Sequence, residues 1–113
     1  MTPITTHVLD ISRGRPGSGI HVELDTYDGG SWRRIGQGVT DDDGRLRTLT
    51  PEDFVPAARR YRLTFDTAAY FRALNTPFFY PRVVVEFIVA EGESHYHVPL
   101  LLSPFGYSTY RGT

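Results

Sequence analysis

Short runs of β-prone residues, each closed by glycine or proline, are the feature that most constrains how this chain can fold. The 113 residues include 11 Gly and 8 Pro, and these separate the runs at intervals of about 8 to 12 residues, the spacing typical of β-sandwiches and β-barrels. The length suits one domain and is too short for two independent cores. We therefore expect a single all-β domain over residues 1–113.

Two segments alternate with a period of two, which predicts strands with one buried face and one face in water. In residues 20–27 the even-numbered side chains are expected in the core and the odd-numbered ones, Asp25 included, in water. In residues 95–102 the even-numbered side chains form a continuous apolar face. His95 and His97 should therefore point together to the opposite side.

The other elements follow from similar patterns. Residues 67–74 change period and predict a two-turn helix, because Ala68, Phe71 and Leu74 share one of its faces. Residues 82–90 are apolar on both faces apart from Glu86, which predicts a central strand covered on two sides. Eight or so antiparallel strands with one short helix make a two-sheet sandwich the expected architecture. Further strands are expected over residues 32–39, 61–65 and 107–111.

Composition excludes several functional classes. Twelve basic and 13 acidic residues leave a net charge of -1, which argues against a sequence-independent nucleic-acid binder. The sequence contains no cysteine and no lysine, so thiolate zinc sites, cysteine nucleophiles and Schiff-base chemistry are excluded. It contains no apolar stretch of about 18 residues and no secretory signal, so we expect a cytoplasmic protein that does not enter membranes.

The histidines are the main candidates for chemistry. His95 and His97 lie two apart on an expected strand, which brings both imidazoles to one side at roughly 7 Å, a spacing useful for metal binding or acid–base work. Two surface polar residues would give the same pattern. His7 lies among apolar residues and could complete a three-histidine zinc site with an open position, although no acidic partner stands beside these histidines. His21 is expected to be solvated.

Several ordered blocks of residues are more specific than any of these motifs. Residues 7–10 read H-V-L-D, residues 40–45 read T-D-D-D-G-R, residues 95–104 read H-Y-H-V-P-L-L-L-S-P, and residues 110–113 read Y-R-G-T. Together they resemble the transthyretin-related 5-hydroxyisourate hydrolases of urate degradation. The resemblance covers nearly the whole chain.

This resemblance implies a transthyretin-like sandwich of two four-stranded antiparallel sheets with one short helix. It further implies a homotetramer whose active clefts lie between dimers. The implied reaction is hydrolysis of 5-hydroxyisourate to 2-oxo-4-hydroxy-4-carboxy-5-ureidoimidazoline, with no metal or organic cofactor.

The resemblance also assigns residues. His7, Arg45 and His97 match the catalytic residues of the family, and His95 supports them. A neutral imidazole can take a proton from water near pH 7, and an arginine can stabilise the oxyanion or hold the oxygens of the substrate. His7 and Arg45 are also expected to contact substrate, together with the C-terminal tail that closes the pocket. That tail comprises Tyr110, Arg111, Gly112 and Thr113, with Thr113 in place of the usual serine.

Two alternatives remain at this level. Transthyretin itself is a non-enzymatic carrier of thyroid hormones with the same fold, so a small-ligand carrier is the second hypothesis. A zinc hydrolase that uses His7, His95 and His97 is the third.

Overall fold

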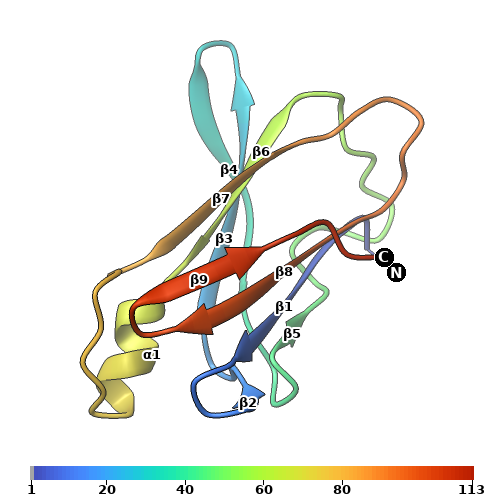
Figure 1. Ribbon diagram of the computed structural model, residues 1–113. Helices are drawn as coiled ribbons and strands as arrows, with labels where there is room; N and C mark the ends of the chain where they lie inside the picture. Colours follow the sequence, from blue (N-terminus) through green and yellow to red (C-terminus); the bar gives the residue numbers. More distant parts are fainter. Residues whose placement is uncertain (1) are drawn as a thin grey trace.

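The computed structural model describes residues 2–113, which form two packed β-sheets and one helix (Figure 1). In the first sheet, β1 (Ile4–Asp10) pairs with β8 (Tyr96–Ser103), and β8 pairs with β9 (Gly106–Thr109). Two strands of two residues each, β2 (Arg15–Pro16) and β5 (Arg45–Leu46), pair with β1 as well.

The second sheet has four antiparallel strands in the order β4-β3-β6-β7. The helix α1 (Thr67–Ala73) follows β6 and lies at one end of the sandwich (Figure 1). No helix among residues 2–113 is long and apolar enough to cross a membrane. The strands are β3 (His21–Asp28), β4 (Ser31–Val39), β6 (Arg60–Phe65) and β7 (Val83–Ile88).

The transthyretin-like sandwich expected from the sequence is confirmed, with two differences in detail. The first sheet has five strands rather than four. Two of them, β2 and β5, are only two residues long, so the periodicity of the sequence could not predict them. The pairing of β1 with β8 is parallel. These two strands lie at opposite ends of the chain and are joined through the whole second sheet, so the tight turn that forces antiparallel pairing is missing between them.

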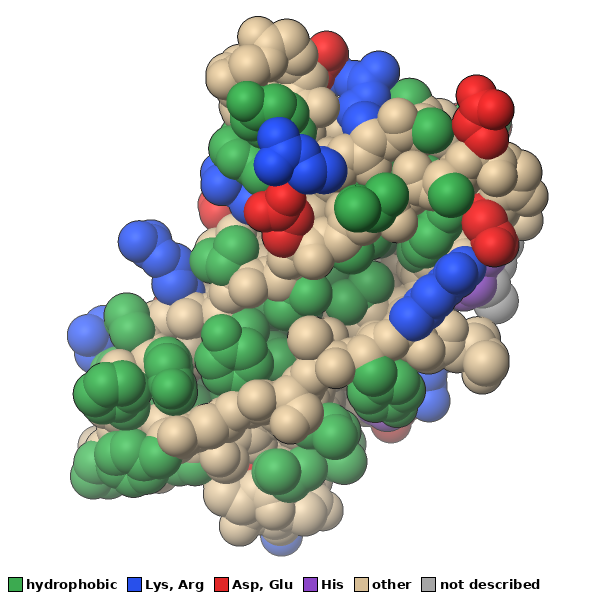
Figure 2. Space-filling model, turned by 45° about the horizontal axis from the view of Figure 1, so that its top comes forward, with side chains coloured by type: hydrophobic (Ala, Val, Ile, Leu, Met, Phe, Trp, Pro, Cys, Tyr) green, Lys and Arg blue, Asp and Glu red, His purple; other side chains and the backbone are tan. Residues whose placement is uncertain are grey.

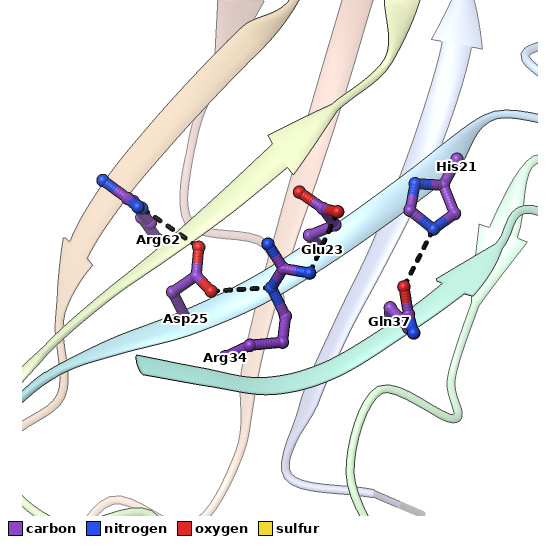
Figure 3. Close-up of polar contacts among 6 residues, drawn as sticks. All are labelled: His21, Glu23, Asp25, Arg34, Gln37 and Arg62. Atoms are coloured by element: carbon purple, nitrogen blue, oxygen red, sulfur yellow. Dashed lines mark hydrogen bonds and ion pairs between the residues drawn. The ribbon is translucent and has the colours of Figure 1, made fainter. Parts of the chain in front are cut away.

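The alternation in residues 95–102 is confirmed, since the even-numbered side chains of β8 are all buried. In residues 20–27 the even-numbered side chains are buried as expected, but Asp25 is buried too, with its side chain only 5% exposed. Asp25 lies at a bulge in the pairing with β4, and Arg34 and Arg62 donate to its two carboxylate oxygens at 2.8 and 3.1 Å (Figure 3). The expectation that Asp25 lies in water was wrong because periodicity cannot show which polar residues will be covered by arginines.

The prediction of a covered central strand over residues 82–90 was also wrong. The strand β7 lies at the edge of its sheet, and Val84 and Ile88 on its outer face are 46% and 73% exposed. The apolar character of both faces therefore leaves hydrophobic surface exposed. Figure 2 shows hydrophobic side chains gathered on one face of the molecule.

The helix is docked onto the first sheet through a buried carboxylate. Asp66 caps the helix by accepting from the backbone N–H of Ala69. The hydroxyl of Tyr70 donates to Oδ2 of the fully buried Asp10 at 2.7 Å. Partial burial and this contact with Asp10 raise the pKa of Tyr70 to about 12. Asp10 ends β1, so the same contact fixes the strand that carries His7.

Candidate active site

Strand register brings the predicted site residues together on the first sheet. His7 in β1 lies opposite Arg45 in β5, and Thr5, two residues earlier, lies opposite His97 in β8. Residues two apart on a strand share a face, so Thr5 and His7 present their side chains to the same side as these partners. Residues from three distant segments of the sequence thus meet on one face.

A cavity of about 210 Å³ opens on this face. Its lining includes Arg45, Arg47, His95, His97 and Thr113. His7 is not part of the lining but stands beside it, through its pairing with Arg45. A larger hollow of about 410 Å³ lies against the second sheet and contains none of the predicted site residues.

The turn before β5 positions Arg45 and contacts His7. Gly44 adopts a φ of 77° there, a conformation that favours glycine. The carboxylate of Asp41 accepts from the backbone N–H groups of Arg45 and Asp43, both at 2.9 Å. These hydrogen bonds lower the pKa of Asp41, and the one from Arg45 has the largest effect. In the same turn, the carbonyl oxygen of Asp43 lies 2.9 Å from Nε2 of His7.

This contact defines which ring nitrogen of His7 carries a proton. A carbonyl oxygen can only accept a hydrogen bond, so Nε2 of His7 carries a proton and donates it to Asp43. In the neutral ring the lone pair then lies on Nδ1. The contact with Asp43 therefore leaves Nδ1 as the ring nitrogen of neutral His7 that can accept a hydrogen bond.

His97 is held from two sides. Its Nδ1 lies 2.8 Å from the hydroxyl of Thr5, and its carbonyl accepts from the backbone N–H of Gly112 at 2.8 Å. A Cβ atom placed on Gly112 would lie 2.6 Å from Cδ2 of the His97 ring, closer than real contacts allow. The absence of a side chain at Gly112 thus lets the tail pass directly against the imidazole.

The surroundings of His97 favour its neutral form. Burial is the largest cause of a lowered pKa of His97, and electrostatic interactions with His7, His95, Arg45 and Arg47 act in the same direction. The two arginines at the cavity, Arg45 and Arg47, suit an anion or a developing negative charge.

The C-terminal tail is divided between two surfaces. Gly112 and Thr113 lie at the cavity, whereas Tyr110 and Arg111 line a separate hollow beside β7 and β8. Arg111 forms an ion pair with Glu93 at 3.3 Å. Within one protomer, therefore, Tyr110 and Arg111 do not line the cavity, although Arg111 also donates to the carbonyl oxygen of His95 at 3.4 Å.

Three residues at the cavity were missed by sequence reasoning, Thr5, Thr6 and Arg47. Thr5 stands two positions before His7, and Arg47 stands two positions after Arg45. Period-two alternation around the predicted residues would have found these two but not Thr6. Among residues 2–113, no three His, Asp or Glu side chains are grouped so that they could hold a metal ion.

Comparison with known proteins agrees with this site. The model of the HIUase/Transthyretin family matches residues 4–112. The chain belongs to this family. It is 42% identical over 110 residues to the 5-hydroxyisourate hydrolase of Salmonella dublin, which covers 97% of this chain and 80% of that protein. The resemblance seen in the sequence is thereby confirmed.

Solved structures show that the family's fold serves two kinds of protein. The structure of Klebsiella pneumoniae 5-hydroxyisourate hydrolase matches with a TM-score of 0.85 and 34% identity, covering 99% of this chain and 100% of that one. Sea bream transthyretin in complex with thyroxine matches with a TM-score of 0.89 and 34% identity, covering 98% and 95%. Overall fold therefore does not separate hydrolase from carrier, and the side chains of the site must do so.

Proposed function

We propose that this protein hydrolyses 5-hydroxyisourate to 2-oxo-4-hydroxy-4-carboxy-5-ureidoimidazoline in urate degradation. The observation that carries the proposal is the meeting of His7, Arg45 and His97 on one sheet face beside a small cavity. The hydrolases similar to this chain support the same substrate.

His7 supplies the base. With Nε2 donating to the carbonyl of Asp43, Nδ1 of His7 accepts a proton from water as the water oxygen bonds to the ring carbonyl carbon of the substrate. General base catalysis of this kind contributes about 10²- to 10⁴-fold. The backbone contact also fixes the orientation of the ring, so little reorganisation is needed for proton transfer.

Arg45 and His97 act on the carbonyl group of the substrate, whereas His7 acts on the attacking water. Attack of water moves the carbonyl electrons onto oxygen, and the guanidinium of Arg45 stabilises this oxyanion. Collapse of the oxyanion breaks the C–N bond of the ring, the protonated His7 returns its proton to the leaving nitrogen, and the new carboxylic acid loses its proton to solvent. The cations around the cavity then favour the carboxylate product. No metal or organic cofactor is part of this proposal.

A homotetramer is part of the proposal, with the active sites at the interface between dimers. The exposed apolar side chains Val84 and Ile88 on β7, and Tyr107 on β9, support association of these edge strands with other copies. Tyr110 and Arg111, which lie away from the cavity within one protomer, would then be available to a neighbouring protomer. Light scattering of the purified protein tests the assembly.

The function is tested on 5-hydroxyisourate generated fresh by urate oxidase, by following its ultraviolet decay with and without the protein. Decay faster than the spontaneous rate, lost in His97→Ala, supports the proposal. Decay at the spontaneous rate with folded, tetrameric protein contradicts it and favours a small-ligand carrier, for which thyroxine binding by calorimetry is the direct test.

A further inference from the structure

Thr5 contacts the predicted catalytic histidine from an unusual position. It lies directly opposite His97 in the parallel pair of β1 and β8, it is 4% exposed, and its hydroxyl oxygen lies 2.8 Å from Nδ1 of His97. Neither the sequence blocks nor the proposed mechanism uses this residue.

The direction of this hydrogen bond follows from the partners available. A threonine hydroxyl carries one proton, and a buried hydroxyl proton needs an acceptor. Elsewhere in the sandwich a buried threonine, Thr26, gives its proton to a backbone carbonyl, that of Arg60. Within residues 2–113, the hydrogen bond of the Thr5 hydroxyl goes to Nδ1 of His97. This contact therefore offers the hydroxyl of Thr5 an acceptor in Nδ1 of His97.

We propose that Thr5 is a positioning residue that holds neutral His97 in the tautomer with its proton on Nε2, which makes His97 a hydrogen-bond donor to the substrate oxygen. The two histidines then have separate roles. His7 keeps an unprotonated Nδ1 because Asp43 accepts from its Nε2, whereas His97 presents an N–H. The kinetic part of this inference rests on the proposed function, but the tautomer is a property of the free protein.

Other contacts of the ring agree with this role. The Nδ1 side faces Thr5, and the Cδ2 side is packed against Gly112. His97 lines the cavity, and with Nδ1 facing Thr5 the ring nitrogen that remains to contact a bound molecule is Nε2. Burial and the surrounding cations also keep the pKa of His97 low, so the ring is neutral and a single tautomer can be selected near pH 7.

The tautomer is tested first, by ¹⁵N NMR of the labelled wild-type protein near pH 7.5, with the His97 signals assigned from the spectrum of His97→Gln. We expect Nδ1 of His97 to resonate as an unprotonated nitrogen and Nε2 as a protonated one. The reverse pattern would overturn the inference whether or not the protein is a hydrolase.

Kinetics then test what the hydroxyl does. Thr5→Val removes the hydroxyl at nearly constant volume. We expect kcat to fall about 10- to 100-fold with KM changed less than about 3-fold, because the hydrogen bond from His97 to the substrate oxygen stabilises mainly the transition state. Thr5→Ser keeps the hydroxyl and should stay within about 3-fold of wild type. Thr26→Val, which removes an equally buried hydroxyl from the other sheet, is the matched control and should also stay within about 3-fold.

The outcomes separate the two proposals. Equal loss in Thr5→Ser and Thr5→Val, or a normal kcat in Thr5→Val, contradicts the positioning role while leaving the hydrolase intact. A wild-type protein that shows no hydrolysis contradicts the proposed function, and the NMR pattern of His97 then decides the role of Thr5 by itself. Should Thr5→Val fail to fold, the NMR pattern and the Thr5→Ser rates still decide.

Discussion

Arg45 and His7 face one another across a two-residue pairing of β5 with β1, which is as short as the pairing of β2 with β1 in the same sheet. Only His7 and its neighbour Thr6 take part in it from β1. The guanidinium that is proposed to stabilise the oxyanion thus depends on the turn around Gly44 rather than on a long strand. Substitutions of Arg45 should therefore affect catalysis with little effect on the fold.

We expect Arg45→Ala to lower kcat/KM for 5-hydroxyisourate about 10²- to 10³-fold, as for the loss of one oxyanion donor. Arg45→Lys keeps the charge but loses the planar fork, and should recover only part of the rate. Steady-state kinetics measure both effects, and thermal unfolding serves as the control for folding. Equal rates for wild type and Arg45→Ala would exclude Arg45 from the mechanism.

Gly112 provides a second test of the site. An added methyl group at Gly112 would lie 2.6 Å from Cδ2 of His97 and 3.1 Å from Pro99, so the tail or the imidazole must move. We expect Gly112→Ala to lower kcat at least 10-fold, since small displacements of a catalytic group are costly. Gly106→Ala is the matched control, because its Cβ would meet only Ser103 Oγ at 3.8 Å. A similar rate in both variants would contradict the idea that the close approach of Gly112 holds the His97 ring in place.

Much of this architecture could be predicted from the sequence, for a physical reason. Alternation identified the buried face of β8 and placed His95 and His97 opposite it, because a strand with one buried face must repeat every two residues. The family blocks then brought in His7 and Arg45. Strand pairing over long sequence separation, such as β1 with β8, leaves no local signal of its own.

What the sequence left out depends on neighbours from other strands. The burial of Asp25 comes from Arg34 and Arg62 on strands to either side, and the contact of Thr5 with His97 comes from the register of β1 on β8. The position of β7 at the sheet edge was missed for a similar reason. An apolar strand at an exposed edge and one in the centre of a sheet have similar sequences, and only the neighbouring strands distinguish them.

The lowered pKa of His97 predicts a pH dependence of stability. Because the folded protein holds the pKa of His97 below its ordinary value, the unfolded chain binds more protons just below pH 6.5. The contribution of neutral His97 is therefore fully present above pH 6.5 and is lost as the pH falls through the folded pKa. Urea unfolding between pH 5 and 7.5 at fixed protein concentration should show a steeper loss for wild type than for His97→Gln. Parallel curves would show that His97 is not held neutral.

The contact between Tyr70 and Asp10 predicts an effect at the alkaline side. Folding raises the pKa of Tyr70 to about 12, so the folded protein keeps this proton between about pH 10 and 12 while the unfolded chain loses it. Stability due to Tyr70 is thus lost as the pH rises through this window, and Tyr70→Phe should lack that loss. At pH 7 the same variant should be about 1 to 2 kcal/mol less stable, because buried Asp10 loses a donor. Urea unfolding at both pH values measures the two effects.

The pair of arginines on Asp25 should contribute more to stability than any exposed ion pair of this protein. The Asp25 carboxylate is 5% exposed, whereas Arg34 and Arg62 are 45% and 33% exposed, so only the acid bears a large desolvation cost and both of its oxygens are paired (Figure 3). We expect Asp25→Asn to lower the free energy of unfolding by about 2 kcal/mol, after allowing for solvent screening of the arginines. Glu86→Gln breaks a pair with Arg60 in which both side chains are nearly half exposed, and should cost less than about 0.5 kcal/mol. Equal losses in the two variants would mean that burial of Asp25 adds nothing to the stability of the fold. Hydrolysis rates should stay at the wild-type level in both variants, because this network lies on the sheet that does not carry the site.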